Sequence, residues 1–485
     1  MMKHLFLAFT LVAAAFPLSG CSTNPATGEN QFTALMSPQQ EIQVGAQEHQ
    51  KIMQQYGMYQ NQTLQNYVSN VGNKVVENTE RPDVEYKFFV LDSPMVNAFA
   101  LPGGYIYTTR GLLALANNEA ELAGVLSHEA GHITGRHSAE RYSRGVATSL
   151  GATLIGAAIG NAQAAQALGV GANLYLTSYS RGQENESDTL GIRYMTKAGY
   201  NPIGMSGFLS SLQAEKALAD KEAGRKVSAS ANSYFSTHPP TIERVNKTRV
   251  EAEQFGIAGL VNRNQYLNMI DGLTYGDSAE QGFVRGQSFY HPKLGFKYSV
   301  PEGFKISNQP RQIVASASSD GSAIIFDFAP NKGNLSMMTF LRETWGQGKP
   351  MADIANIKVN GMNAATGVVQ GSVNKRTMNI RLVAIQWSND QVVRFQMAMP
   401  TNANTARENQ FKDSLYSFKR MSASEKRAVK PYRIDIITAR SRDTVATMSN
   451  RMAQTDFRED RFRTLNGLTA NDTVVSGTKY KIIVD

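Results

Sequence analysis

The sequence predicts a multidomain α+β protein with three folded parts. A mainly α-helical domain with a small edge-stranded sheet comes first, a small α/β sandwich-like domain follows, and a βααβ unit ends the chain. The 485 residues exceed the length of an ordinary single domain. Helical patterns dominate up to about residue 255, whereas short, alternating, glycine-rich segments begin after about residue 265. The prediction rests on this change of pattern and on the strand-helix-helix-strand order of the last segment.

The composition is that of folded domains with a moderately basic surface. Hydrophobic residues make up 42% of the chain, charged residues make up 18%, and the formal net charge is +9. Nucleic-acid sites concentrate Lys and Arg in patches. Here these residues are spread along the chain, without a run of five or six. We therefore expect a solvated basic surface and no nucleic-acid partner.

The N-terminus has the pattern of a bacterial lipoprotein signal. Lys3 precedes an apolar stretch from Leu5 to Leu18, which is too short to cross a membrane as a mature helix. The stretch ends in Leu18-Ser19-Gly20-Cys21, which resembles a lipobox and implies cleavage before Cys21 and acylation there. Cys21 is the only cysteine, so the chain cannot form an internal disulfide.

This signal predicts where the protein resides. Residues 1–20 are expected to be a signal peptide, and residues 21–36, which are polar and rich in Asn and Thr, a tether. Ser22, instead of an aspartate, follows the lipidated cysteine, which favours the outer membrane. We expect a protein of the bacterial periplasm that contacts the membrane through its lipid anchor.

The first domain is expected at residues 37–265. Ser37-Pro38-Gln39-Gln40 is a strong helix start, with a Ser cap, Pro at the first helical position and Gln at the third. The helical pattern continues, with a break near Gly57, to about Asn78. Alternation from Val84 predicts a strand. The other expected elements are a hairpin at 98–108, helices at 117–144, 184–198, 202–218 and 241–255, and a buried or lid-like helix in the small-residue stretch 145–171.

The C-terminal half is predicted to hold two smaller units. Alternating segments and a closing helix at 408–418 indicate an α+β domain at 286–420, whose role the sequence does not define. A charged linker follows, and residues 431–485 form the βααβ unit. Its expected elements are a strand at 432–438, helices at 443–452 and 459–465, and a strand at 479–484.

The most informative pattern is the H-E-x-x-H of residues 128–132. Residues four apart lie on one face of a helix, so His128 and His132 can bind one ion. Neutral imidazoles are good ligands for Zn²⁺. Glu129 lies next to His128 and can reach a water at the metal, where it would act as general base. The pattern predicts one zinc ion per chain.

A catalytic zinc needs a third protein ligand. A third histidine six residues after His132 is excluded, because that position is Ser138. The nearby His137 is one residue short and is predicted to be a packing or hydrogen-bonding residue. The remaining option is a carboxylate from a second helix.

Three acids in Ser180–Asp188 are candidates for this ligand. Glu184 and Asp188 share a helix face, whereas Glu186 points elsewhere. Glu184 has the longer side chain and is the better ligand. Asp188 is placed to accept a hydrogen bond from a ligand histidine and so to orient its ring.

H-E-x-x-H, followed about fifty residues later by S-R-x-x-E-x-x-x-D, resembles the zinc metallopeptidase family of the CAAX prenyl protease and HtpX. Three further pieces match over about residues 35–255: Asn97-Ala-Phe-Ala-Leu-Pro-Gly-Gly104, Arg136-His137, and Thr237-His238-Pro239 with Arg244. The resemblance implies a mainly α-helical zincin-type peptidase domain in which Glu184 binds zinc and Asp188 supports a ligand. With the lipobox, the chain most resembles the periplasmic, quality-control branch of that family.

The resemblance also implies roles for His238 and Arg244. The counterpart of His238 lies near the metal, either stabilising the tetrahedral oxyanion or closing the site as a fourth ligand. The first role would make His238 catalytic, whereas the second would hold the enzyme latent. Arg244 is expected either to orient a substrate carbonyl or to brace its loop.

The hairpin offers a way to bind substrate. An extended peptide can add as a strand to the edge formed by Asn97, Ala98, Phe99 and Ala100, which would bring a scissile carbonyl to the zinc. Because such pairing uses the main chain, it tolerates many sequences. The alternative is a hairpin that only supports the helix.

The C-terminal parts resemble known modules. Asp443-Thr444-Val445, Leu465-Asn466-Gly467-Leu468 and Lys479-x-Lys481-Ile482 resemble a LysM domain, which implies peptidoglycan as a candidate partner. Arg442 stands where that family usually has Gly, which puts glycan affinity in doubt. Residues 286–420 resemble PsbP and similar small α/β modules.

The expected function is that of a lipid-anchored periplasmic zinc endopeptidase. Its substrates would be misfolded or stalled envelope and outer-membrane proteins. Two alternatives stay open: a zinc-locked chaperone or assembly factor that holds unfolded clients without cutting them, and a peptidoglycan-binding scaffold.

Overall fold

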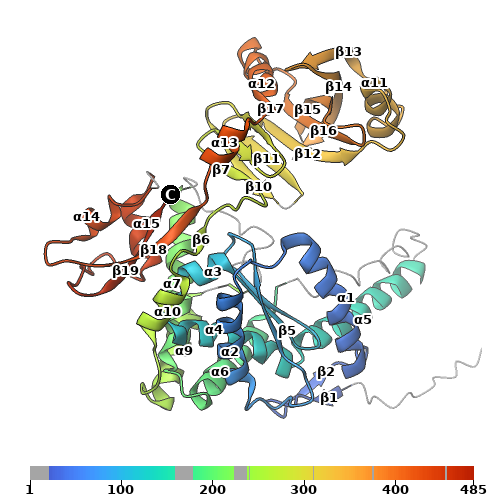
Figure 1. Ribbon diagram of the computed structural model, residues 1–485. Helices are drawn as coiled ribbons and strands as arrows, with labels where there is room; N and C mark the ends of the chain where they lie inside the picture. Colours follow the sequence, from blue (N-terminus) through green and yellow to red (C-terminus); the bar gives the residue numbers. More distant parts are fainter. Residues whose placement is uncertain are drawn as a thin grey trace, which may run out of the picture.

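The computed structural model describes residues 21–158, 178–222, 238–239, 241–309, 311–373, 376–453 and 456–485 (Figure 1). The predicted signal peptide, the part of the small-residue stretch from residue 159, and Thr237 lie outside these residues. Within the described part of the chain, no helix has the length and apolar character needed to cross a membrane.

The first part of the chain is mainly helical, as predicted. Ser37 begins its first helix with the expected capping box, in which Gln40 is the reciprocal partner. The helices are α1 (Pro38–Tyr56), α2 (Gln62–Val76), α3 (Arg110–Leu115), α4 (Glu119–Thr134), α5 (His137–Ala158), α6 (Arg181–Lys197), α7 (Ile203–Glu222), α9 (Ile242–Phe255) and α10 (Arg263–Ile270).

Two predicted elements of this part were wrong in extent. The single helix expected at 117–144 ends at Thr134, because Arg136 has a φ of 51° and leaves the helical region. The side chain of Arg136 donates a hydrogen bond from Nε to Glu41 Oε1 at 3.0 Å. Residues 21–36, expected to be a tether, hold the hairpin β1 (Cys21–Thr23) and β2 (Asn30–Phe32).

A three-stranded sheet lies beside these helices. Its order is β3 (Lys87–Leu91), β5 (Tyr105–Thr109), β4 (Ala98–Leu101), with β3 parallel and β4 antiparallel to the central strand. The strand predicted from Val84 therefore begins only at Lys87. One face packs on the main core, which includes Ala98, Ala100 and Ile106, and the other contacts α1. The strand β4 is an edge of this sheet.

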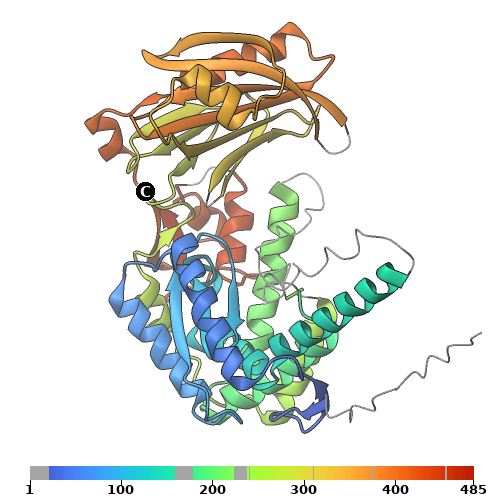
Figure 2. The ribbon, with the colours of Figure 1, turned by 90° about the vertical axis from the view of Figure 1, so that its right-hand side faces the viewer.

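The second part is rich in strands and lies above the helical domain in Figure 1. A seven-stranded antiparallel sheet has the order β10-β11-β12-β16-β15-β14-β13, and a four-stranded sheet the order β17-β9-β8-β7 (Figure 2). The helix α12 (Thr405–Ser417) matches the predicted closing helix. The strands are β7 (Phe283–Arg285), β8 (Ser288–His291), β9 (Phe296–Ser299), β10 (Phe304–Gln309), β11 (Gln312–Ala317), β12 (Ala323–Pro330), β13 (Ala352–Val359), β14 (Met362–Val373), β15 (Arg376–Gln386), β16 (Gln391–Pro400) and β17 (Lys419–Arg420), with the short helices α11 (Met337–Thr339), η2 (Phe340–Trp345) and α13 (Ala423–Ala428).

The last unit has the expected strand-helix-helix-strand order. Its elements are β18 (Tyr432–Thr438), α14 (Val445–Ser449), α15 (Arg458–Leu465) and β19 (Lys479–Val484). Their sheet also takes in β6 (Thr274–Tyr275), in the order β19-β18-β6. Phe462 and Ile482 belong to the same hydrophobic core as Leu126 of α4. The C-terminal unit thus completes the core of the first domain.

Candidate metal centre

The site is built on two helices that pack closely. Gly131 of α4 lies against α6, where an added Cβ would meet Ser187 Oγ at 2.6 Å. Gly191 of α6 lies against α4, where a Cβ would come within 3.0 Å of the His128 backbone nitrogen. Asn118 caps α4, and Ser180 starts α6 with a capping box. The helices therefore bring their donor-bearing faces together.

Four buried residues bring donor atoms together at this seam. The Nε2 atoms of His128 and His132 lie 3.1 Å apart. Glu184 Oε1 lies 3.4 Å from His132 Nε2, and Oε2 lies 3.6 Å from His128 Nε2. The donors of these three residues and of His238 all lie within 4.8 Å of one another. The candidate ligands His128, His132 and Glu184 are thus adjacent, with His238 as a fourth neighbour.

His238 enters the cluster through one ring nitrogen. Its Nδ1 lies 2.8 Å from Glu184 Oε1 and 3.3 Å from His128 Nε2. The other nitrogen, Nε2, lies 3.7 Å from Glu129 Oε1. The ring is fully buried and therefore bridges the donor cluster and the predicted general base.

Asp188 and Arg244 lie behind the donors. Asp188 Oδ1 is 2.9 Å from His128 Nδ1, on the side of the ring opposite the cluster. Arg244 donates to both oxygens of Asp188, at 2.8 and 2.7 Å, and its Nη1 lies 2.7 Å from Glu184 Oε2. Asp188 therefore lies behind the ring of a candidate ligand histidine. Arg244 braces the two carboxylates and also donates to the backbone oxygen of Pro239.

Glu129 is fully buried beside the cluster. Burial raises the pKa of its carboxyl to about 8, although the neighbouring His128 opposes the shift. The backbone of Ala100, on β4, lowers the same pKa through a hydrogen bond, so the carboxyl lies at the sheet edge. A carboxyl with a raised pKa suits transfer of a proton in both directions near neutral pH.

The donor set suits a zinc ion. Burial lowers the pKa of His132 well below its usual value, which keeps an imidazole lone pair available. Burial raises the pKa of Glu184, but His238 and the hydrogen bond from His132 outweigh it, so the net pKa lies well below the usual value. Neutral imidazoles and an ionised carboxylate are the ligands that Zn²⁺ prefers.

Sequence reasoning missed residues around His132. Tyr179 stacks on the His132 ring, with centroids 3.6 Å apart and planes 11° apart. Arg141 lies over the other face of Tyr179, 3.7 Å from its centroid. His137 is a hydrogen-bonding residue, as predicted, because its Nδ1 lies 2.8 Å from His132 Nδ1. Glu186 points away from the donors and lies 3.4 Å from His137. No spacing rule connects Tyr179 to the motif.

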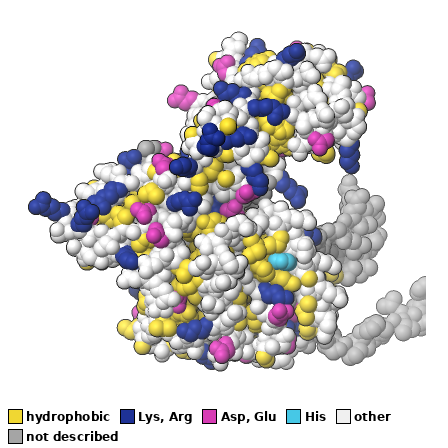
Figure 3. Space-filling model, in the orientation of Figure 1, with side chains coloured by type: hydrophobic (Ala, Val, Ile, Leu, Met, Phe, Trp, Pro, Cys, Tyr) yellow, Lys and Arg dark blue, Asp and Glu magenta, His cyan; other side chains and the backbone are white. Residues whose placement is uncertain are grey.

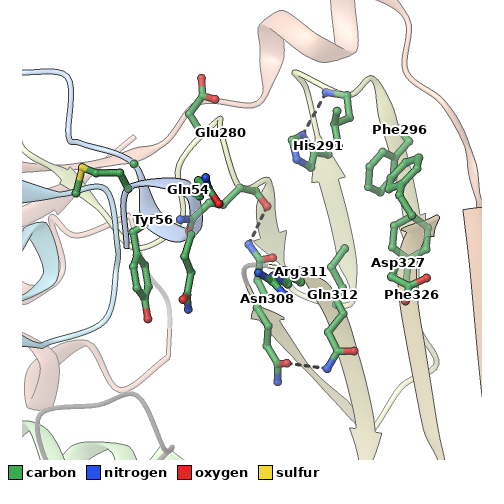
Figure 4. Close-up of a pocket in the computed structure, with 18 residues that line it drawn as sticks. Gln54, Tyr56, Glu280, His291, Phe296, Asn308, Arg311, Gln312, Phe326 and Asp327 are labelled. Carbon is green, nitrogen blue, oxygen red and sulfur yellow. Dashed lines mark hydrogen bonds between the residues drawn. The ribbon is translucent and has the colours of Figure 1, made fainter. Parts of the chain in front are cut away.

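A cleft that does not contain the candidate metal centre lies between α1 and the strand-rich part. Its volume is about 420 Å³, and Figure 4 shows Tyr56 on one side and Asn308, Gln312 and Phe326 on the other. None of the four donor residues lines it.

Comparison with known proteins identifies the class. Residues 62–252 match the model of peptidase family M48, which supports a zinc metallopeptidase site in this part of the chain. The chain is also similar to the beta-barrel assembly-enhancing proteases. The identity to the protein of that name is 29% over 214 residues in Yersinia pestis, covering 42% of each chain, and 28% over 261 residues in Escherichia coli, covering 52% of this chain and 51% of the relative.

A eukaryotic relative matches as well. The mitochondrial metalloendopeptidase OMA1 of Schizosaccharomyces pombe is 29% identical over 204 residues, covering 41% of this chain and 57% of the relative. The chain therefore spans only about half the length of the curated relatives it matches. A structure of cyanobacterial PsbP matches 30% of this chain and 98% of its own, with 11% identity and a TM-score of 0.22. That score supports no conclusion about residues 286–420.

Proposed function

We propose that the protein is a zinc endopeptidase of the bacterial periplasm that cleaves misfolded or stalled envelope proteins, those of the outer membrane included. One observation carries the proposal: His128, His132 and Glu184 converge in a buried cluster with Glu129 beside it. The similarity to beta-barrel assembly-enhancing proteases supports the substrate class, because β-barrel assembly is a process that misfolded or stalled envelope proteins would obstruct.

The residues divide the reaction among them. His128, His132 and Glu184 would hold the zinc, which when bound supplies Lewis-acid polarisation of the peptide carbonyl and of the attacking water. Glu129 takes the proton of that water on its carboxylate and delivers it to the leaving amine. The edge strand at Asn97–Ala100 would pair with the substrate backbone and present the scissile carbonyl.

Replacing Glu129 tests this mechanism. The Glu129→Gln change keeps the shape but removes the proton acceptor, so cleavage of an unfolded protein should fall about 10²–10⁴-fold. Zinc content, measured by metal analysis, should remain one per chain. An unchanged phenotype of this variant in cells, despite lost proteolysis, would favour the chaperone alternative.

We propose that His238 is the fourth donor of a latent state. Its Nδ1 is close to both Glu184 and His128, which is where an open coordination position would otherwise be needed. On this proposal, His238→Ala raises proteolysis of the purified enzyme. If His238 acts instead as an oxyanion donor, the same change lowers turnover on the order of 10²–10³-fold.

We also propose that acylation at Cys21 anchors the protein to the outer membrane. The lipobox pattern supports this. Growth with a labelled fatty acid should label the wild-type protein but not a Cys21→Ala variant, and fractionation should then release the variant from the membrane. Peptidoglycan binding through residues 431–485 is testable by pull-down of the full chain.

A further inference from the structure

Aromatic rings form a row across the active-site sheet. Phe99 on β4 pairs in register with Tyr107 on β5, which pairs in register with Phe89 on β3. The Phe99 and Tyr107 centroids are 4.7 Å apart, and those of Phe89 and Tyr107 are 5.3 Å apart, both stacked. His49 of α1 lies 4.7 Å from Phe89. The row therefore crosses the whole sheet, from β3 at one edge to β4 at the other.

The row is partly open to solvent. Tyr107 is fully buried, but Phe89, Phe99 and His49 are only half-buried. Figure 3 shows hydrophobic side chains gathered over α1 and β5, beside histidine atoms at the surface. The ring at the edge, Phe99, has a partner strand on one side only, because β4 ends the sheet order.

The backbone of β4 defines which groups face outward. Thr109 donates to the Asn97 carbonyl, so Asn97, Phe99 and Leu101 direct their backbone groups toward β5. By alternation, Ala98 and Ala100 direct theirs to the outer side. The Ala100 backbone lowers the pKa of the Glu129 carboxyl, which places that carboxyl on the outer side of β4 and agrees with this register. A strand added here in the antiparallel direction would bond to Ala98 and Ala100.

The same register determines which face of the sheet each substrate side chain would contact. The substrate residues opposite Ala98 and Ala100 direct their side chains toward α4, because both alanines lie on that face of the sheet. The residue between them stands opposite Phe99 and points to the aromatic face. That pair is not hydrogen-bonded, and in such pairs the side chains approach most closely.

We infer that Phe99 forms a subsite for an aromatic side chain of the substrate. The aromatic residue would extend the row Phe89–Tyr107–Phe99 by one ring, next to the bond that is cut. This inference rests on the proposed function and narrows its substrate class to extended segments with an aromatic residue at that position. Such segments occur in β-strands whose alternate residues are apolar.

Binding to a variant that cannot cleave tests the subsite. The probe is a set of labelled ten-residue strand-forming peptides that carry Phe, Leu, Ala or Asp at one position, titrated against zinc-loaded, full-length Glu129→Gln protein. Stacking predicts that the Phe peptide binds roughly two- to tenfold more tightly than the Ala peptide. Adding Phe99→Ala should reduce that ratio to about one, and Phe99→Tyr should restore it. Phe89→Leu changes the ring of the same row that lies farthest from Phe99, on β3. It is the matched control and should keep the Phe-to-Ala binding ratio of the unchanged protein.

Cleavage by the wild-type enzyme separates this inference from the proposed function. In digests of an unfolded protein, Phe, Tyr and Trp should be enriched at one fixed position from the cut bond, and Phe99→Ala should abolish the enrichment. Cleavage without enrichment of aromatic residues would overturn the subsite. A Phe-to-Ala binding ratio that Phe99→Ala leaves unchanged would do the same. Neither result would contradict the proposed endopeptidase activity. If no peptide binds and neither the wild type nor the His238→Ala variant cleaves the unfolded protein, both are wrong.

Discussion

Asp188 shows how one side chain organises the centre. It is fully buried and contacts His128 Nδ1 on one side and the Arg244 guanidinium on the other. Burial raises the pKa of its carboxyl, but the charge of Arg244 outweighs this, so the net pKa is lowered and the group stays ionised. An ionised acceptor behind a ligand histidine keeps the Nε2 lone pair directed at the donor cluster.

We expect Asp188→Asn to weaken zinc binding about 10- to 100-fold, as is usual when the partner of a ligand histidine is lost. Competition with a chelator measures the affinity. Asp83→Asn, which removes a largely exposed carboxylate that pairs with Arg81, is the control and should leave the affinity unchanged. Equal zinc affinity in the two variants would contradict the role of Asp188.

His291, on β8, is expected to make the strand-rich part sensitive to acid. Burial lowers the pKa of His291 to about 4, and the neutral ring accepts a hydrogen bond from the Leu294 backbone at 3.3 Å. Between pH 6.5 and 4 the unfolded chain binds a proton that the folded chain does not, so stability falls as the pH falls through this window.

The expected loss of stability is roughly 1–3 kcal/mol between pH 6.5 and 4. Urea unfolding followed by tryptophan fluorescence measures it, because both tryptophans, Trp345 and Trp387, lie in this part of the chain. The His291→Asn variant should show a flatter dependence, since its amide does not titrate. If the free energy of unfolding of the variant and of the wild type falls equally with pH, His291 is not the cause of the acid sensitivity.

The contact between α4 and α6 determines whether the ligands from separate helices meet. Gly131 has no room for a Cβ, because Ser187 Oγ and the Ser187 backbone lie within 3.2 Å of where it would be. A methyl group there must push α6, and with it Glu184, away from His128 and His132. Gly182, at the start of the same helix, has only Ser180 Oγ at 3.8 Å.

We therefore expect Gly131→Ala to cost about 1–3 kcal/mol of stability through overpacking and to lower zinc occupancy. Gly182→Ala should instead be neutral or add up to about 1 kcal/mol, because alanine is the better helix former. Thermal unfolding and metal analysis of both variants are the measurements. If Gly131→Ala retains full zinc at wild-type stability, the close packing does not position the ligands.

Lys481 joins the last strand to the segment that precedes α4. It is fully buried on β19, and its Nζ donates to the backbone oxygens of Ala114, Leu115 and Ala116 at 2.8–3.0 Å. These carbonyls are at the end of α3, immediately before α4 begins at Glu119. The C-terminal strand therefore stabilises the entry to the helix that carries the H-E-x-x-H motif.

Lys481→Met removes three hydrogen bonds to buried carbonyls, so we expect a loss of about 1–3 kcal/mol. Lys479→Met, two residues earlier on the same strand, removes only an exposed bond to Asn268 and should change stability little. Chemical unfolding and zinc content of both variants provide the comparison. Equal stability of the two would refute a bracing role for the last strand.

Local patterns predicted the parts of the site that lie close together in the chain. The spacing of His128 and His132 places them on one helix face, and the Ser37 cap follows from short-range hydrogen bonds. The break at Arg136 was not predicted, because the left-handed residue is held by an ion pair with Glu41, 95 positions away. Tyr179 was missed for a similar reason, since its stacking on His132 is a tertiary contact.

The sequence by itself determined the chemistry: two imidazoles one helical turn apart, an acid next to the first, and a second acidic helix. Periodicity and side-chain chemistry act over a few residues, so these features can be read locally. The tertiary structure decided which donors meet, because the distance between α4 and α6 depends on packing at Gly131 and Gly191. It also decided that the last strand belongs to the peptidase core, since Lys481 reaches carbonyls more than 360 residues earlier in the chain.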